Sequence, residues 1–284
     1  MAGREFSLEH LTLLDVAPPD LVTLAAEAGF DSVSLRISPA TPGEQPWPIT
    51  LGSPMLADTI SRARGTGIRV LGAEAIRLDS GGPSGWEPIL ETAAQLGARY
   101  VNAMSGSGDL SRLSDRFGEL TRMAALYGIR PVIEFMAYQP VRTLGAALDI
   151  AARSGGGGVL VDALHVQRCG VDLGQLSRAD PALLSYVQLC DAPLKPPAGL
   201  RRPASLPRSQ PAGDDDQALE ARTSRLLPGE GELPLTGLLS ALPAHLPVGV
   251  EAPSLALSQE LTPRQLAERA RHAAQRVLAM TVPP

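Results

Sequence analysis

Residues 158–165 read Gly-Val-Leu-Val-Asp-Ala-Leu-His, so an apolar run leads directly into an acidic residue. A short run of small and apolar residues predicts a strand that is buried on both faces. This run ends at Asp162, and His165 follows three residues later. A carboxylate at the end of a buried strand needs a cation, hydrogen bonds or a metal to offset its desolvation. The stretch therefore predicts that Asp162 has partners elsewhere in the chain.

Three further strand-like runs also carry a polar residue near their ends. Glu134 closes Arg-Pro-Val-Ile-Glu, Gln188 lies near the end of Ser-Tyr-Val-Gln-Leu-Cys-Asp, and Glu251 closes Pro-Val-Gly-Val-Glu. Side chains alternate along a strand, so one face of each strand can direct its polar residue at a common centre. The four runs therefore predict a shared polar site at the carboxyl ends of neighbouring strands.

Strand-like and helix-like segments alternate about eight times along the 284 residues. This alternation predicts a parallel sheet. No glycine-rich nucleotide fingerprint follows the first strand, and a (β/α)8 barrel typically needs ~250 residues. We therefore expect residues 1–284 to form a single TIM-barrel domain with eight parallel strands. Expected strands besides the four above are 6–11, 32–37, 69–78 and 99–104. Expected helices are 21–28, 54–64, 86–96, 110–127, 141–153, 172–176 or longer, 235–242 and 263–280.

The number of residues between successive polar strand ends is similar twice and then increases. It is 28 residues from 134 to 162 and 26 from 162 to 188, but 63 from 188 to 251. Much of the excess lies in residues 193–225, which are rich in proline, arginine, serine and glycine. Such a composition buries too little apolar surface for a separate domain. We expect a long loop insertion after strand 7, with an active-site lid as its candidate role.

Composition excludes several classes of protein. A net charge of −5 argues against a nucleic-acid partner, which needs a concentrated basic face. Lys195 is the only lysine, which leaves Schiff-base and pyridoxal chemistry without a lysine at a strand end. Cys169 and Cys190 form no disulfide framework. No apolar run reaches the ~20 residues needed to cross a bilayer, and the N-terminal residues lack the order of a signal peptide. We expect a cytoplasmic protein with a small-molecule substrate and no membrane partner; homo-oligomerisation stays open.

The motifs VIEF, VDALH, VQLCD and VEAP resemble those of the sugar isomerase/epimerase superfamily of xylose isomerase-like TIM barrels. This superfamily includes ketose 3-epimerases, inosose dehydratase, hydroxypyruvate isomerase and dehydroshikimate dehydratase. The resemblance covers essentially the whole chain and implies one divalent metal ion. Its ligands would be Glu134, Asp162, Gln188 and Glu251, with Gln188 in place of the family's common histidine.

The resemblance also implies residues that contact the substrate. His165 matches a substrate-contacting histidine, with a buried structural histidine as the alternative. Arg225 best matches an arginine that contacts substrate oxygens. Arg225 or Arg222 is a candidate anion clamp, and the alternative is that both are solvated loop charges. Glu74 and Asn102 are candidates to line the mouth of the barrel.

Four further residues complete the candidates. His10 is a candidate to face the pocket, and Asp191 is equally compatible with a supporting role behind the ligands or with none. His245 and His272 are expected at the surface.

The ligand set consists of oxygen atoms, which favours Mn2+ or Mg2+ over Zn2+, with Co2+ less favoured. The alternative is that each acid is separately paired in a barrel layer. A metal next to a carbonyl acidifies the neighbouring C–H, and the family's epimerases use two glutamates on opposite substrate faces. Glu134 and Glu251 would then remove and return a proton through an enediolate. This predicts an isomerase or epimerase of a small sugar, sugar acid or polyol ketone.

Three other functions are compatible with the same barrel. A dehydratase of a cyclic polyol ketone, such as an inosose or dehydroshikimate, would begin with the same proton abstraction. Abasic-site DNA cleavage occurs in endonuclease IV, which shares this barrel but uses three zinc ions and several histidines, and this chain has only four histidines and no basic face. A non-catalytic scaffold is the last alternative, and metal analysis of the purified protein discriminates it.

Overall fold

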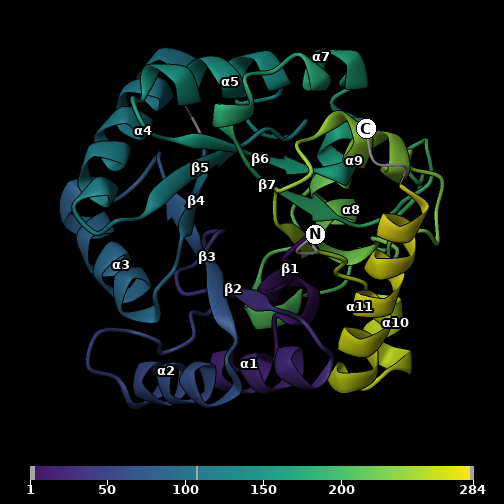
Figure 1. Cartoon of the computed structure of the whole chain (residues 1–284), viewed down its shortest axis with the longest axis horizontal. Coiled ribbons are helices and arrows are strands. Elements are labelled where there is room, and N and C mark those ends of the chain that lie inside the picture. The colour runs from purple at the N-terminus through teal and green to yellow at the C-terminus, as the bar shows by residue number, and fades with distance from the viewer. Residues whose placement is uncertain (1–3, 107, 282–284) are drawn as a thin grey trace.

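The computed structural model describes residues 4–106 and 108–281, in which eight parallel strands form a closed barrel in chain order (Figure 1). This confirms the predicted TIM barrel. The strands are β1 (Phe6–Glu9), β2 (Ser32–Arg36), β3 (Arg69–Arg77), β4 (Tyr100–Met104), β5 (Arg130–Glu134), β6 (Gly158–Asp162), β7 (Leu184–Leu189) and β8 (Val248–Val250).

Helices surround the barrel and pack their apolar faces against the strands (Figure 1). They are α1 (Pro18–Glu27), α2 (Pro54–Thr66), α3 (Pro83–Leu96), α4 (Leu110–Ala125), α5 (Leu144–Arg153), α6 (Ala163–Arg168), α7 (Leu173–Ser177), α8 (Asp216–Thr223), α9 (Leu235–Ala241), α10 (Leu255–Glu260) and α11 (Pro263–Met280). None of these helices is both long and apolar enough to span a membrane, within the part of the chain described.

The ends of the helices follow local sequence signals. In α11, Thr262 and Gln265 form a reciprocal capping box and Pro263 occupies the first turn, which is why this helix has the predicted bounds. The predicted first strand is too long, because His10–Leu13 forms a 3-10 helix directly after Glu9. The helix predicted from residue 141 begins at Leu144, where Thr143 caps it.

Apolar side chains fill the barrel below its polar rim. Leu71, Tyr100, Val132, Leu160 and Tyr186 form one buried cluster, in which the Tyr100 and Tyr186 rings stack with centroids 5.3 Å apart. Val132, Leu160 and Tyr186 each lie two residues before a predicted site residue on the same strand. The polar residues therefore lie one layer above this cluster, at the carboxyl ends of the strands.

The insertion between β7 and β8 contains α8, which the sequence did not indicate, and a 3-10 helix at Pro207–Ser209. Arg208 docks this segment on the loop between β2 and α2. Its side chain donates to the carbonyl oxygens of Gln45 (3.1 Å) and Pro46 (3.0 Å), and its guanidinium lies 3.8 Å from the centroid of the Trp47 ring. These contacts hold the insertion across one side of the barrel mouth.

We predict that Arg208→Ala loosens the insertion without unfolding the barrel, because it removes two hydrogen bonds and a cation–π contact at one anchoring point. Limited proteolysis with thermolysin should cut within residues 193–215 several-fold faster than in the wild type. Arg201→Ala, which changes an exposed arginine of the same segment, is the matched control. Equal cleavage rates for the two variants would contradict the anchoring role.

Candidate functional site

The four predicted ligands lie at the carboxyl end of the barrel and are all buried. Glu134 and Asp162 are the last residues of β5 and β6. Gln188 is the second-to-last residue of β7, and Glu251 directly follows β8. Their exposed fractions are 5%, 0%, 1% and 6%, respectively. Strand pairing brings Asp162 opposite Gln188. The barrel therefore brings the four side chains to one end, as the strand pattern predicts.

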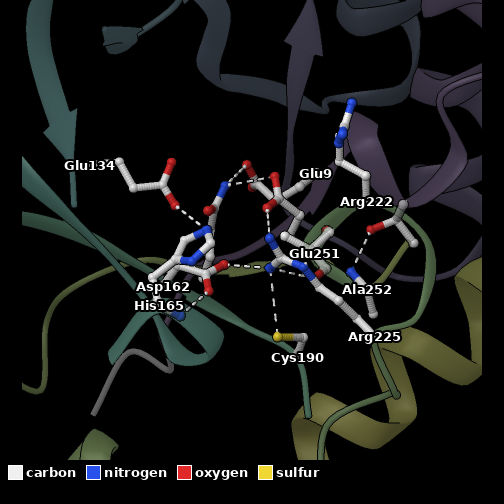
Figure 2. Close-up of polar contacts among 12 residues, drawn as sticks. Glu9, Glu134, Asp162, His165, Cys190, Arg222, Arg225, Glu251 and Ala252 are labelled. Atoms are coloured by element: carbon white, nitrogen blue, oxygen red, sulfur yellow. Dashed lines mark hydrogen bonds and ion pairs between the residues drawn. The ribbon is translucent and has the colours of Figure 1, made fainter. Parts of the chain in front are cut away.

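Arg225 is the cation that joins Asp162 to Glu251 (Figure 2). Its Nη1 lies 2.5 Å from Asp162 Oδ2, and its Nη2 lies 3.1 Å from Glu251 Oε2. It also donates to the carbonyl oxygens of Ala221 and Glu251, so most of its N–H groups are in use. Burial opposes ionisation of Asp162, but the Arg225 charge, together with His165 and the hydrogen bonds from both residues, holds the pKa of that carboxyl below its usual value. Arg225 thus contacts the predicted ligands themselves as well as lining the cavity.

The end of β8 is fixed by the 3-10 helix that follows its neighbouring strand, β1. Thr12 Oγ1 donates to the Val250 carbonyl oxygen and accepts from the Ala252 amide, both at 3.0 Å. These two bonds hold the backbone on both sides of Glu251. The Glu251 carboxyl is thereby positioned before any ligand binds.

Gln188 connects Glu251 to a residue that the sequence analysis missed. Its Nε2 donates to Glu251 Oε1 (3.2 Å) and to Glu9 Oε2 (3.1 Å), whereas its Oε1 has no hydrogen-bond partner among the described residues. Glu9 ends β1 and is fully buried. A polar residue at the end of an apolar run is the signal that identifies the four predicted ligands, and Glu9, at the end of β1, carries the same signal.

Glu134 has one engaged and one open oxygen. Its Oε2 accepts a hydrogen bond from Asn102 Nδ2 at 3.4 Å, and its Oε1 lies 3.6 Å from His165 Nε2 without a hydrogen bond from any described residue. Burial, followed by the nearby Asp162 charge, raises the pKa of Glu134 to about 8. Without a cation, this carboxyl therefore holds a proton at neutral pH.

His165 lies on α6 and faces the same site (Figure 2). The Asp162 side chain caps this helix by accepting from the His165 amide at 3.1 Å, which explains the fixed spacing of the two residues. The ring of His165 contacts Tyr138 edge to face, with centroids 5.6 Å apart. Burial lowers the pKa of His165 to about 4, so its imidazole is neutral near pH 7.

A cavity of about 260 Å³ opens above these groups. Glu134, Glu251, His165, Glu74 and Asn102 are among the side chains that line it. The helix α8 contributes Ala218 and Ala221 to its wall, so part of the insertion closes the site.

The remaining arginines at the cavity have protein partners. Arg222 donates to the carbonyl oxygens of Pro211, Ala212 and Ala218. Arg36 donates to Glu44 and Glu74, and Arg77 to Asp79 and the Ala40 carbonyl oxygen. The two candidate anion clamps, Arg222 and Arg225, are thus both engaged within the protein.

The other candidates have structural surroundings. His10 is buried, accepts from the Arg36 amide through Nδ1, and contacts the Val16 carbonyl oxygen through Nε2, so it does not face the cavity. The Asp191 carboxyl accepts from the amides of Ala192, Gly229 and Leu233 and fixes that loop. His245 and His272 are exposed, as predicted, and the two cysteines are unpaired.

The donor atoms at the site suit a hard divalent cation. Potential ligand atoms of Glu134, Asp162 and His165 lie within 4.8 Å of one another, and those of Glu9, Glu74 and Glu251 form a second such group. Glu134 Oε1 and Gln188 Oε1 are buried acceptors without a donor among the described residues, and the same holds for three further oxygens at this end of the barrel, Glu9 Oε1, Glu74 Oε1 and Asn102 Oδ1. Three carboxylates and the Arg225 guanidinium leave two negative charges for a bound ion to offset.

Comparison with known proteins places this barrel in a family. The family model described as xylose isomerase-like TIM barrel matches residues 22–276. No curated protein matches the chain significantly.

Many solved structures share the fold. The IolI protein with a bound zinc atom superposes with a TM-score of 0.75 at 19% identity, covering 98% of this chain and 99% of its own. A D-psicose 3-epimerase with D-tagatose from Clostridium cellulolyticum H10 gives 0.71 at 13% identity, covering 98% and 99%. A xylose isomerase domain protein from Alicyclobacillus acidocaldarius gives 0.69 at 21% identity, also covering 98% and 99%. The chain belongs to the xylose isomerase-like TIM barrel family.

Proposed function

We propose that this protein is a divalent-metal-dependent isomerase or epimerase of a small sugar or polyol ketone. One observation carries the proposal: Glu134, Asp162, Gln188 and Glu251 are buried at the ends of four neighbouring strands, with open oxygens on Glu134 and Gln188. Membership of the family and the fold shared with an epimerase support it. The oxygen donors favour Mn2+ or Mg2+.

The chain's own residues would divide the work of proton transfer. A bound divalent ion would polarise a ketone carbonyl and acidify the adjacent C–H. Glu134 on β5 and Glu251 after β8 reach the cavity from different strands, so one carboxylate can take a proton and the other can supply one. His165, neutral and 3.6 Å from Glu134, can hydrogen-bond a substrate hydroxyl. Burial and α8 keep bulk water from these groups.

The pairing of the cavity arginines favours an uncharged substrate. Arg36, Arg77, Arg222 and Arg225 all donate to acceptors of the protein. A carboxylate or phosphate on the substrate would have to displace these contacts. A neutral polyhydroxy ketone needs only hydrogen bonds, which Glu74, Asn102 and His165 can provide.

We predict that the protein with Mn2+ exchanges a substrate C–H with solvent in the manner of an isomerase. Chelator-treated protein, with and without Mn2+, is incubated in D2O with a panel of ketoses and cyclic polyol ketones. NMR should then show deuterium at the carbon next to the carbonyl, together with a rearranged product of unchanged composition. A product that has lost one water would instead establish the dehydratase. No metal-dependent deuterium uptake from any compound would contradict the proposal.

Removing either proposed proton carrier should strongly slow this exchange. Glu134→Gln and Glu251→Gln are each expected to slow it by roughly 10²–10⁴-fold, the usual contribution of a general acid or base. Glu260→Gln, which changes an exposed glutamate on α10, is the matched control and should keep the wild-type rate. Exchange at the wild-type rate in either site variant would remove that residue from the mechanism.

The chelator-treated protein should become less stable as pH rises from 6.5 to 8.5. Burial raises the pKa of Glu134 to about 8 and that of Glu9 to about 7, so the native state keeps protons that the unfolded chain has lost. Raising pH through these values removes this stabilisation, by roughly 1–2 kcal/mol for one such group. His10 and His165, with pKa lowered to about 4, act in the opposite direction but only below pH 6.5.

Urea unfolding at several pH values measures this effect. Saturating Mn2+ should remove most of the decrease, because the ion stabilises the ionised carboxylates. Glu134→Gln should flatten the profile of the chelator-treated protein. A free energy of unfolding that does not change over this range would contradict the proposed charge state of the site.

A further inference from the structure

We propose that Glu9 is a positioning residue that holds the Gln188 amide with its oxygen towards the cation site. This inference rests on the proposed function, because it assumes that Gln188 Oε1 is a ligand. It adds a role for a fifth strand, β1, which lies outside the four motifs. Glu9 itself is not among the proposed ligands.

The hydrogen bonds determine which end of the amide faces which group. Gln188 Nε2 lies 3.1 Å from Glu9 Oε2 and 3.2 Å from Glu251 Oε1, which are both acceptors. A reversed amide would put its oxygen against these two carboxyl oxygens and leave its NH2 group in place of the unpartnered Oε1. Two donors at that position would repel a cation. Only the observed orientation therefore presents an oxygen to the ion.

The barrel makes specific room for Glu9. In β8, Gly249 pairs with Ser7 of β1 and with Gln188 of β7. A Cβ atom at Gly249 would lie 2.5 Å from Glu9 Oε1, closer than side-chain atoms tolerate. The absence of a side chain at residue 249 lets Glu9 pass over β8 and reach Gln188. The glycine, the glutamate and the glutamine thus form one arrangement.

The chemistry of a glutamine ligand explains why such an acceptor is needed. An amide has a donor end and an acceptor end of nearly the same shape, so a half-turn about its last torsion exchanges them. Glu251 Oε1 also accepts from Gln188. However, Glu251 is itself a proposed ligand, so a bound ion would be coordinated by its oxygens. Glu9 is the acceptor that remains when an ion binds. Hydrogen bonds that orient a metal ligand typically change metal affinity by roughly 10–100-fold.

A double-mutant cycle on metal binding tests this role. Titration calorimetry measures the Kd for Mn2+ of chelator-treated wild type, Glu9→Ala, Gln188→Ala and the double variant at one pH. We expect Glu9→Ala to weaken binding by roughly 10–100-fold. Glu9→Ala should have no further effect when Gln188 is already alanine, because the residue acts through the amide.

Two further variants separate orientation from charge. Glu9→Gln keeps an acceptor for Nε2 but removes the charge, and it should bind Mn2+ within about threefold of the wild type. Glu74→Gln is the matched control, because it removes a carboxylate of the same buried group that has no hydrogen bond to Gln188. Losses of similar size in Glu9→Ala, Glu9→Gln and Glu74→Gln would show that charge alone matters and would overturn the inference.

The remaining outcomes are also decisive. If Glu9→Ala binds Mn2+ like the wild type, or loses as much affinity without Gln188 as with it, the inference is wrong while the proposed function stands. If the wild type binds no Mn2+ or Mg2+, both fail. Should Glu9→Ala not fold by circular dichroism, the exchanged pair Glu9→Gln with Gln188→Glu replaces it. That pair should bind Mn2+ more tightly than Gln188→Glu alone, and equal affinity would contradict the positioning role.

Discussion

The constraint on which this structure depends is the burial of five carboxyl groups at one end of the barrel. Four of them, Glu9, Glu134, Asp162 and Glu251, lie at or next to the carboxyl ends of strands, and Glu74 lies three residues before the end of β3. Each is at most 6% exposed. Carboxylates this close in a dry site repel one another and lose their hydration, so they stay ionised only beside cations. Two arginine guanidiniums, one on β2 and one following α8, do not balance five charges. The raised pKa values are the consequence.

The rest of the site is organised to share a positive charge among these acids. Arg225 forms an ion pair with one oxygen of Asp162 and one of Glu251. Glu134 and Gln188 each keep one oxygen without a hydrogen-bond donor among the described residues. The insertion after β7 carries Arg225 and also covers the cavity, so the segment that supplies the fixed cation also excludes water. The apolar cluster around Tyr186 supports this layer from below. The buried carboxyl groups that can bind an ion therefore lower the stability of the fold when no ion is bound.

Much of the fold and part of the site could be predicted from local sequence. Apolar runs ending in Glu134, Asp162 and Glu251 identify strands and their polar ends, because both signals lie within a few residues. The partners of those side chains depend on closure of the barrel and leave no local pattern: Arg225 meets Asp162 across 63 positions, and Glu9 meets Gln188 across 179. The helix α8 was missed because the surrounding segment is rich in proline and glycine.

The central claim is that four side chains from β5 to β8 hold one divalent ion. Anomalous diffraction from crystals grown with Mn2+ tests it most directly. The account predicts one strong peak at coordinating distance, roughly 2.0–2.6 Å, from oxygens of Glu134, Asp162, Gln188 and Glu251. A peak confined to the group of Glu9 and Glu74, or a map without any peak at the rim, would contradict it.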